Sequence, residues 1–344
     1  MLGKRACRRH SSTKANKSRP SKPKAHGPRT ATMPAIQDFP FDEIMDELQK
    51  LLFSRANVRG ETVAIHESLA RALEHQGLPV AARRLAGEAC AAALLAAAAL
   101  QFDGTVLLQI DGDGPVRLLV AEVRKDLSYR VSVRMRDNAG DIDPNADLTT
   151  LVNANGRGRC AFILDMTGRT RDQQPYQGIV PLAGASLAEA LEQYFAQSEQ
   201  VETVLRLAAD DVAAGGLMLQ KMPATGGKLP EGSDPEGWSR LRMFAETVKS
   251  EELLTLRPED VNRRLFWEES PLVTMEAKPQ FRCSCTDERF DNIVRSLGEA
   301  EAREILAEQA GRFTVTCQFC GKTKTYDEVD VKALFAAAAQ KPTA

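Results

Sequence analysis

Four cysteines near the C-terminal end constrain the fold of this 344-residue chain more than any other feature. They form two close pairs, Cys283-Ser-Cys285 and Cys317-Gln-Phe-Cys320, with 31 residues between the pairs. No histidine follows His75, so a metal site in this region would use sulfur alone. Two pairs of thiolates satisfy the tetrahedral preference of a zinc ion. The pattern therefore predicts that the chain folds back between the pairs and brings all four sulfur atoms around one Zn2+.

The first pair, a C-x-C, is closer than the pairs of most zinc ribbons and fingers. Two cysteines one residue apart can also close a small, strained disulfide. In a long chain without a secretory signal, paired cysteines are more often metal ligands or redox thiols than structural disulfides. The residues alone leave two interpretations open. One is an inert zinc clip that holds a small tail domain, and the other is a metal site that can also be oxidised.

The composition is that of a globular protein with a sizeable core, because 43% of the residues are hydrophobic and 27% are charged. The length allows two or three domains. A net charge of -2 gives no overall attraction to nucleic acid or membranes. The most apolar stretch, Leu85 to Leu100, is mostly alanine, contains Glu88 and is shorter than the roughly 20 residues that cross a bilayer. We expect it to form a buried helix whose small side chains let neighbouring backbones approach closely.

The first 37 residues differ from the rest, with ten Lys or Arg and no Asp or Glu. Such a segment cannot bury enough apolar surface to fold, so we expect a disordered basic extension over residues 1–35. It fits an organelle transit peptide or a nucleic-acid-binding arm. We favour a third hypothesis, that translation begins at Met33, because Met33-Pro34 opens directly onto the first ordered-looking segment. We then expect a cytoplasmic protein and assign no role to Cys7.

Residues 36–226 mix helix and strand patterns, which predicts an α+β domain. Helices are predicted over residues 42–53, 67–74 and 79–100 and from residue 186, and strands over residues 58–65, 105–110, 116–123, 129–135, 159–166, 176–180, 201–208 and 217–222. No nucleophile, base and orienting group stand in a catalytic arrangement, so we expect no enzyme. His66 and His75 are isolated, and the apolar surroundings of Cys90 and Cys160 indicate inert core thiols.

Residues 227–281 have the composition of a charged connector with two amphipathic helices. Their narrow apolar stripes contain Trp238, Leu241, Val248, Val261 and Leu265. Helices with so little core of their own should persist only while docked on a neighbour. We therefore expect a metastable helical linker, although an ordinary helical connector remains an alternative.

Residues 282–335 form the predicted zinc-binding tail domain. Phe290, Ile293, Val294 and Leu297 give it one short helical stripe. So small a unit depends on its metal, because structural zinc contributes roughly 10–16 kcal/mol in metal-folded peptides and a whole domain is stable by only roughly 5–15 kcal/mol. Loss of zinc should therefore unfold the tail.

Several short motifs precede the cysteine pairs in a fixed order. They are Phe102-Asp-Gly104, Gly112-Asp-Gly-Pro115, Asn145-Ala-Asp-Leu148, Tyr176-Gln-Gly178, Gly215-Gly-Leu-Met-Leu-Gln220 and Glu251-Glu-Leu-Leu-Thr-Leu256. With the C-S-C and C-Q-F-C pairs, this combination resembles the redox-regulated thirty-three-kilodalton heat-shock chaperones of bacteria over residues 36 to about 330. The basic extension departs from the family pattern.

This resemblance implies an ATP-independent holdase that is silent when reduced. It implies that Cys283, Cys285, Cys317 and Cys320 bind one Zn2+ as thiolates. It further implies that oxidation pairs Cys283 with Cys285 and Cys317 with Cys320 and expels the metal. The tail then unfolds and the linker undocks, which offers its apolar faces to unfolding client proteins. The residues expected to bind clients are Trp238, Leu241, Val248, Val261 and Leu265. The family's active form is a homodimer, so we expect one on oxidation.

Two other functions compete with this one. A zinc-ribbon nucleic-acid module is suggested by the four cysteines together with Lys322 and Lys324, but Asp327, Glu328 and Asp330 argue against a phosphate-binding surface. A thiol-disulfide oxidoreductase would use Cys317 and Cys320, and the second cysteine pair argues against it. We expect neither a nucleic-acid nor a membrane partner.

Overall fold

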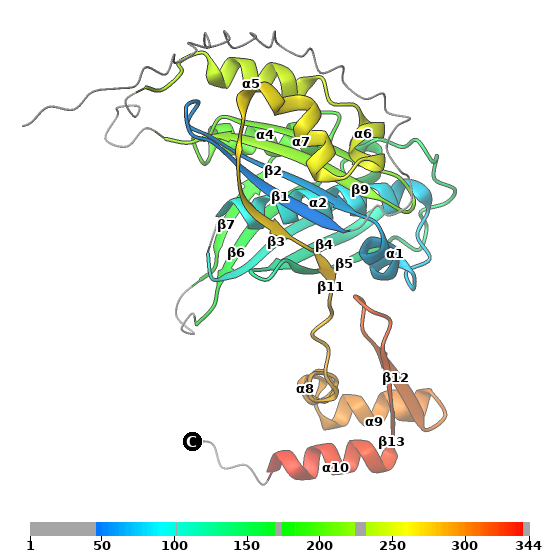
Figure 1. Cartoon of the computed structure of the whole chain (residues 1–344). Helices are drawn as coiled ribbons and strands as arrows, with labels where there is room; N and C mark the ends of the chain where they lie inside the picture. Colours follow the sequence, from blue (N-terminus) through cyan, green and yellow to red (C-terminus); the bar gives the residue numbers. More distant parts are fainter. Residues whose placement is uncertain (1–45, 101, 169–173, 183, 224–231, 340–344) are drawn as a thin grey trace, which may run out of the picture. The chain divides into compact units, whose positions relative to one another are not determined.

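The computed structural model describes residues 46–100, 102–168, 174–182, 184–223 and 232–339. The basic extension expected over residues 1–35, with Cys7, lies outside them. The described chain is a mixture of helices and sheets, as predicted (Figure 1). It has three parts, which are named here the core (residues 46–223), the linker (residues 232–281) and the tail (residues 282–339).

The first sheet has five antiparallel strands in the order β10-β1-β2-β9-β8. Its strands are β1 (Glu47–Phe53), β2 (Val58–Ile65), β8 (Thr203–Ala209), β9 (Ala214–Lys221) and β10 (Leu272–Ala277). β10 belongs to the linker, so this sheet is completed by a strand that comes more than 200 positions after β1 in the sequence.

The second sheet has six strands in the order β11-β5-β4-β3-β6-β7. Its strands are β3 (Gly104–Asp111), β4 (Val116–Arg124), β5 (Ser128–Met135), β6 (Arg159–Met166), β7 (Tyr176–Val180) and β11 (Gln280–Phe281). All pairings are antiparallel except that of β11, which runs parallel to β5. The short helices α1 (Glu67–Leu73) and α3 (Leu148–Val152) and the longer α4 (Leu187–Gln197) connect these strands.

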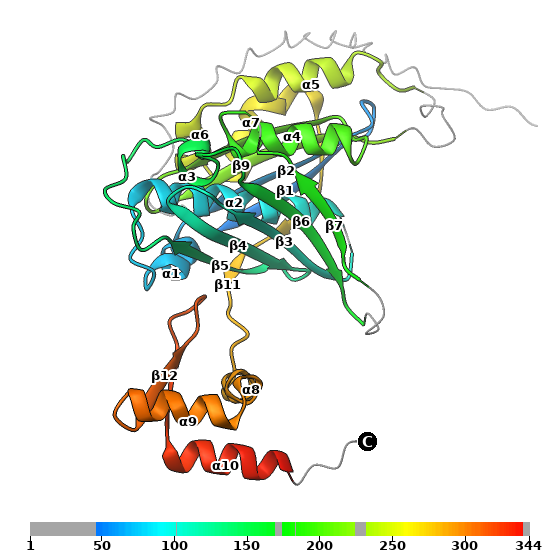
Figure 2. The ribbon, with the colours of Figure 1, turned by 180° about the vertical axis from the view of Figure 1, so that it is seen from behind.

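The alanine-rich helix α2 (Val80–Leu100) packs against strands of both sheets and forms the centre of the core (Figures 1 and 2). Fifteen of its residues are buried, which confirms the expected buried helix. Its small side chains allow close packing. A Cβ atom on Gly87 would lie 2.9 Å from the Cβ atom of Ala209 on β8 and 3.0 Å from that of Ala214 on β9. Side chains this small let a long helix lie directly on a sheet.

The helix predicted over residues 42–53 is wrong, because residues 47–53 form strand β1, and residues 42–45 lie outside the described part of the chain. Both faces of β1 are covered. Leu48 and Lys50 face α2, whereas Gln49 and Phe53 meet the linker helix α7. A strand buried on both sides loses the alternation of apolar and polar residues. Its closely spaced leucines then imitate helical spacing.

The linker helices α5 (Gly237–Glu246), α6 (Ser250–Thr255) and α7 (Pro258–Phe266) cover the face of the five-stranded sheet that points away from α2 (Figures 1 and 2). Two adjacent glycines of β9 allow helices to approach on both faces. A Cβ atom on Gly215 would lie 2.1 Å from the backbone oxygen of Leu253 in α6, and one on Gly216 would lie 2.9 Å from the side chain of Leu95 in α2.

The second half of the linker is not helical, which corrects the expectation of a helical segment over residues 227–281. After the 3-10 turn η3 (Trp267–Glu269) the chain enters β10, which pairs with β1, and then β11, which pairs with β5. Only Lys278 and Pro279 separate these two strands. The pairing partners lie more than 150 positions earlier, so no local pattern indicates these strands.

The tail contains α8 (Asp287–Leu297), α9 (Glu299–Glu308), the hairpin β12 (Arg312–Thr316) and β13 (Thr323–Asp327), and α10 (Glu328–Ala339). Its small core includes Phe290, Val294, Leu306 and the stacked rings of Phe313 and Tyr326. Ile293 and Leu297, expected on the buried stripe of α8, are 46% and 37% exposed. The buried face of α8 is therefore narrower than the sequence suggested.

Candidate metal centre

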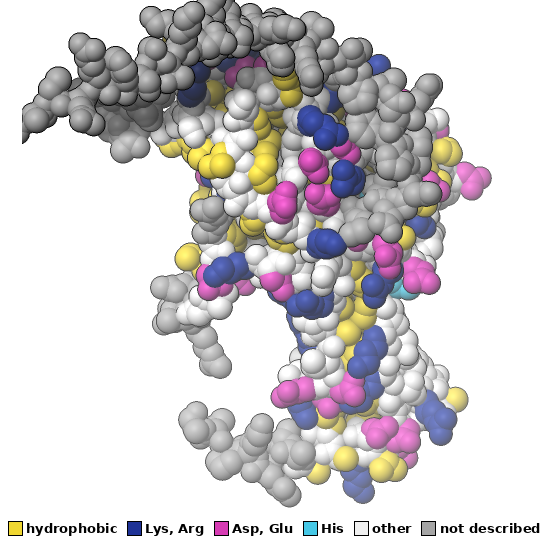
Figure 3. All heavy atoms as spheres, in the orientation of Figure 1, with side chains coloured by type: hydrophobic (Ala, Val, Ile, Leu, Met, Phe, Trp, Pro, Cys, Tyr) yellow, Lys and Arg dark blue, Asp and Glu magenta, His cyan; other side chains and the backbone are white. Residues whose placement is uncertain are grey.

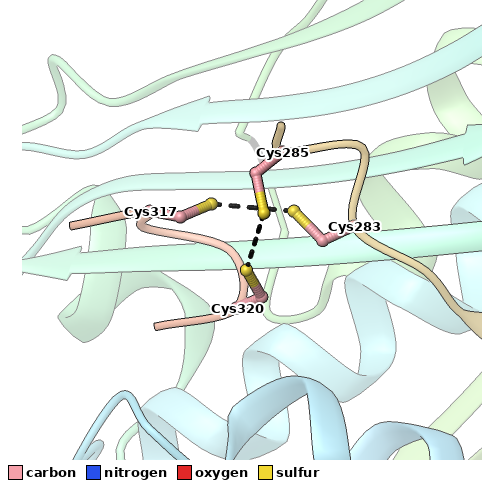
Figure 4. Close-up of side chains that lie close together, drawn as sticks. All are labelled: Cys283, Cys285, Cys317 and Cys320. Atoms are coloured by element: carbon pink, nitrogen blue, oxygen red, sulfur yellow. Dashed lines mark hydrogen bonds between the residues drawn. The ribbon is translucent and has the colours of Figure 1, made fainter. Parts of the chain in front are cut away.

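The structure brings the four paired cysteines together (Figure 4). Cys283 and Cys285 follow β11, and Cys317 and Cys320 lie in the turn between β12 and β13. All four sulfur atoms lie within 4.8 Å of one another. The Sγ atoms of Cys283 and Cys317 are 3.6 Å apart, and those of Cys285 and Cys320 are 3.2 Å apart. Four sulfur ligands at about 2.3 Å from one zinc ion would be about 3.8 Å apart. The cluster therefore has the spacing of a four-sulfur metal site.

The second pair is held in a tight turn that depends on Gly321. Its φ of 68° is in the left-handed region, where glycine is favoured. The N–H of Gly321 donates to the carbonyl of Cys317 at 2.9 Å, and the N–H of Cys317 donates to the carbonyl of Lys322 at 2.8 Å. A Cβ atom at position 321 would also lie 2.9 Å from the ring of His75. The turn thus directs both thiols toward the first pair.

The charges at the site favour a bound cation. Burial raises the pKa of Cys285, Cys283 and Cys317 act in the same direction, and the hydrogen bond with Cys320 acts in the opposite direction. Burial is also the main cause of the raised pKa of Cys320. Burial also opposes ionisation of Cys283, but the N–H of Cys285 and hydrogen bonds to the other thiols lower its pKa overall. Four thiolates this close repel one another unless a positive charge lies between them. The donor set of four sulfurs suits Zn2+.

Arg130 of β5 lies beside both cysteine pairs, and its role was not predicted from the sequence. Its guanidinium group forms an ion pair with Glu122 of β4, the residue opposite it in the sheet. Nη1 donates to the hydroxyl of Ser284 at 3.1 Å, and the guanidinium carbon lies 4.2 Å from the centre of the Phe319 ring. Nothing in the sequence around Arg130 indicates that it contacts Ser284 and Phe319.

His75 is a second core residue at the site. Its Nε2 lies 3.4 Å from the carbonyl oxygen of Gln318, in the C-Q-F-C turn. The sequence indicated only an isolated histidine, because the contact joins residues 243 positions apart. His75 thus lies against the backbone of the metal centre, whose sulfur ligands all come from the tail.

The structure buries four of the five apolar linker residues predicted to bind clients. Trp238, Leu241, Val261 and Leu265 are 8%, 0%, 2% and 7% exposed. Val248, expected on the same face as Trp238, lies beyond the end of α5 and is half-buried. Phe266 is fully buried with its ring 5.1 Å from that of Phe53, and it was not among the residues predicted from the sequence. These side chains are therefore hidden while the linker is docked.

The remaining candidates do not form a site. Cys90 and Cys160 are fully buried, and burial raises the pKa of both thiols, to about 12 for Cys160. Lys322 and Lys324, which suggested phosphate binding, form ion pairs with Asp287 and Asp291. Figure 3 shows basic and acidic side chains mixed over the visible face of the tail. Within the described ranges, no helix is long and apolar enough to span a membrane.

The fold and the site together define a protein with three parts: an α+β core, a linker docked on its sheet, and a tail whose four cysteines could hold a metal ion. A family model described as Hsp33 protein matches residues 46–327. The chain therefore belongs to the Hsp33 family, and the resemblance inferred from the motifs is confirmed.

Relatives in this family are named 33 kDa chaperonin. The protein of Methylobacillus flagellatus is 39% identical over 294 residues, which cover 85% of this chain and 95% of the relative. That of Chromobacterium violaceum is 38% identical over 291 residues, covering 84% and 94%. The crystal structure of the 33 kDa chaperonin of Thermotoga maritima has a TM-score of 0.69 and 23% identity, covers 86% of this chain and 99% of its own, and shows the same fold.

Proposed function

We propose that this chain is an ATP-independent chaperone of the holdase type, activated when its four-cysteine centre is oxidised. The observation that carries the proposal is the burial of the linker's apolar side chains on the five-stranded sheet, in a segment whose end leads directly to Cys283. Membership of the Hsp33 family and the name 33 kDa chaperonin of its relatives support the chaperone activity.

The metal in this proposal is one Zn2+ held by Cys283, Cys285, Cys317 and Cys320. Their spacing within 4.8 Å and their all-sulfur donor set fit this ion. Bound zinc keeps thiols in the thiolate form, which is the form that reacts with peroxide. A reducing cytoplasm, our proposed location, would maintain the thiols in the reduced, metal-binding state.

Oxidation is proposed to join Cys283 to Cys285 and Cys317 to Cys320. For each pair, one peroxide molecule takes two electrons from two thiolates. Its O–O bond breaks, two protons are taken up, and a disulfide and two water molecules form. Sulfur atoms joined in disulfides are no longer thiolates, so these four residues would then no longer hold a metal ion. The tail core is small, so loss of the metal unfolds it.

The linker responds because its last strand, β11, is continuous with the first cysteine pair. When the tail unfolds, the linker undocks and exposes Trp238, Leu241, Val261 and Leu265, with Val248 beside them. We propose that these residues bind unfolding client proteins, and that two oxidised chains form a homodimer. The pairing of Lys322 and Lys324 with aspartates weighs against the alternative of a nucleic-acid module.

The test is a client-aggregation assay on zinc-loaded protein before and after peroxide treatment, with zinc content measured on the same samples. We expect suppression of aggregation to rise as zinc is lost. A Cys90→Ala variant is the matched control, since it removes a thiol buried far from the centre in sequence. An oxidised protein that has lost its zinc and does not hold the client would contradict the proposal.

The disulfide pairing needs its own measurement, because the short sulfur contacts in the structure join the two pairs rather than the members of one pair. Peptide mapping of the oxidised protein should recover Cys283 linked to Cys285 and Cys317 linked to Cys320. Recovery of Cys283–Cys317 and Cys285–Cys320 instead would show that oxidation fixes the tail in its folded arrangement.

A further inference from the structure

The contacts of Arg130 have a pattern that the proposed switch does not explain. Ser284 is the residue between the two cysteines of the first pair, and Phe319 lies between those of the second. One guanidinium group of the core therefore contacts the interior residue of both pairs, by a 3.1 Å hydrogen bond to Ser284 and a 4.2 Å contact with the ring of Phe319. Arg130 is only 7% exposed, so these interactions are shielded from water.

The guanidinium group is fixed from the core side. Glu122 accepts from Nη2 at 2.5 Å, and the two residues are direct partners across β4 and β5. Next to Arg130, the carbonyl of Tyr129 accepts the N–H of Arg282 at 2.9 Å. The first cysteine pair is thus tied to β5 by backbone and side chain. The second pair meets the core through Arg130 and His75.

We propose that Arg130 is a positioning residue that holds the two cysteine pairs together against the core sheet and thereby sets how readily the metal centre opens. This inference deepens the proposed redox switch and rests on it. Arginine suits this position because its planar fork can hold a carboxylate, a hydroxyl and an aromatic face at the same time, whereas the compact ammonium group of lysine cannot. When the pairs separate, the guanidinium group loses its contact with Ser284, with Phe319 or with both.

The experiment measures the rate at which zinc passes from the full-length protein to an excess of a chromophoric chelator, under reducing conditions without oxidant or client. Arg130→Met should release zinc about tenfold faster, the expected effect of losing one shielded, charge-assisted hydrogen bond. Arg134→Met is the matched control. Arg134 is an exposed residue four positions further along the same strand. Within the described ranges, no hydrogen bond or ion pair of its side chain is found. It should release zinc at the wild-type rate.

Two further variants separate positioning from general destabilisation. Arg130→Met alone leaves the Glu122 carboxylate with only its pair to Arg124 among the described residues. Glu122→Gln combined with Arg130→Met removes that carboxylate and should still release zinc faster than Glu122→Gln alone, with the same thermal unfolding of the core. Ser284→Ala combined with Phe319→Leu removes these two tail contacts and keeps the interactions of Arg130 with Glu122 and Cys283. This double variant should also release zinc faster, and adding Arg130→Met to it should have a smaller effect than Arg130→Met has in the wild type.

The outcomes distinguish this inference from the proposed function. A wild-type protein that takes up no zinc overturns both. A wild-type protein that takes up zinc and releases it at the rate of Arg130→Met overturns the positioning role alone. Equal acceleration in Arg134→Met, or full additivity between Arg130→Met and the Ser284 and Phe319 changes, also overturns it, because the effect would then be one of general charge or stability.

Discussion

The hydroxyl of Thr62 donates a 2.6 Å hydrogen bond to the side-chain oxygen of Asn262, 200 positions later in the chain. The amide nitrogen of Asn262 in turn donates to Gln49 Oε1 at 3.0 Å. All three residues are buried, and they join α7 of the linker to β1 and β2 of the core sheet. A satisfied polar group within an apolar contact favours one docked arrangement over others. This contact therefore fixes where the linker sits.

Replacing Asn262 with alanine should loosen the linker without oxidation. The change removes the acceptor of the buried Thr62 hydroxyl and the donor to Gln49 Oε1, while Gln49 Nε2 keeps its bond to Glu276. Loss of such buried partners costs about 1–3 kcal/mol. We expect faster proteolysis and hydrogen exchange over residues 237–277 in the reduced, zinc-bound protein. Glu259→Gln is the control, because Glu259 is an exposed residue of the same helix. Unchanged protection in Asn262→Ala would mean that apolar packing alone holds α7.

Gly215 and Gly216 offer a second way to separate linker docking from core stability. Alanine at 215 would place a Cβ atom 2.1 Å from the backbone oxygen of Leu253, so α6 must move outward. We expect Gly215→Ala to expose the linker and to suppress client aggregation in the reduced state. Alanine at 216 would instead press on Leu95 of α2. Gly216→Ala should therefore lower the thermal stability of the core and leave the reduced protein inactive. If Gly215→Ala and Gly216→Ala have the same phenotype, the assignment of these two residues to opposite faces of the sheet is wrong.

The two tryptophans should report differently on metal removal. Trp238 is 8% exposed and its indole N–H donates to Glu202 at 2.9 Å, whereas Trp267 is 59% exposed. If loss of zinc undocks the linker, Trp238 enters water and the fluorescence emission shifts to longer wavelength. We expect Trp267→Phe to keep this shift and Trp238→Phe to lose it. A shift that follows Trp267 would place the rearrangement elsewhere in the linker.

Glu61 should make the stability of the core depend on pH. Its side chain is buried beneath α2, 3.8 Å from Lys50 Nζ, and neither carboxylate oxygen accepts a hydrogen bond from a described residue. Burial raises its pKa to about 7, although Arg59 and Lys50 act in the opposite direction. The folded protein then retains a proton that the unfolded chain releases near pH 4.5. The contribution of Glu61 to stability should therefore be largest below about pH 4.5 and fall as the pH rises to about 7, by at most about 3 kcal/mol.

Glu61→Gln tests this because glutamine imitates the neutral acid. Urea unfolding at pH 5 and pH 8 should show a smaller loss of stability in Glu61→Gln than in the wild type, so that the variant is the more stable protein at pH 8. Glu304→Gln, at an exposed position of α9, should follow the wild type. A variant whose stability falls with pH as steeply as that of the wild type would show that other groups cause the decline.

The sequence predicted the elements whose signals are local. Strands over residues 159–166 and 176–180 match β6 and β7, and the alanine-rich stretch forms α2. The convergence of the four cysteines was also predictable, because metal ligands must meet and their spacing is short within each pair. In these cases the residue types and their local spacing are enough to predict the structure.

The errors and omissions lie where distant segments meet. The helix predicted at β1 is wrong because α2 and α7 cover both faces of this strand. No local pattern predicts β10, because its first residues, Leu272 and Val273, are exposed and its partner is the distant β1. The contact of Arg130 with Ser284 joins residues 154 positions apart. Only the tertiary arrangement reveals such a contact.

The chain between the five-stranded sheet and Cys283 contains very few residues outside strands. Lys278 and Pro279 are the only residues between β10 and β11, and Arg282 is the only one between β11 and Cys283. Three extended residues span only about 10 Å. A movement of Cys283 by more than a fraction of this length therefore cannot be absorbed by a loop, and must pull strand residues out of their pairing. The geometry makes the backbone itself the mechanical link between sulfur chemistry and the sheet.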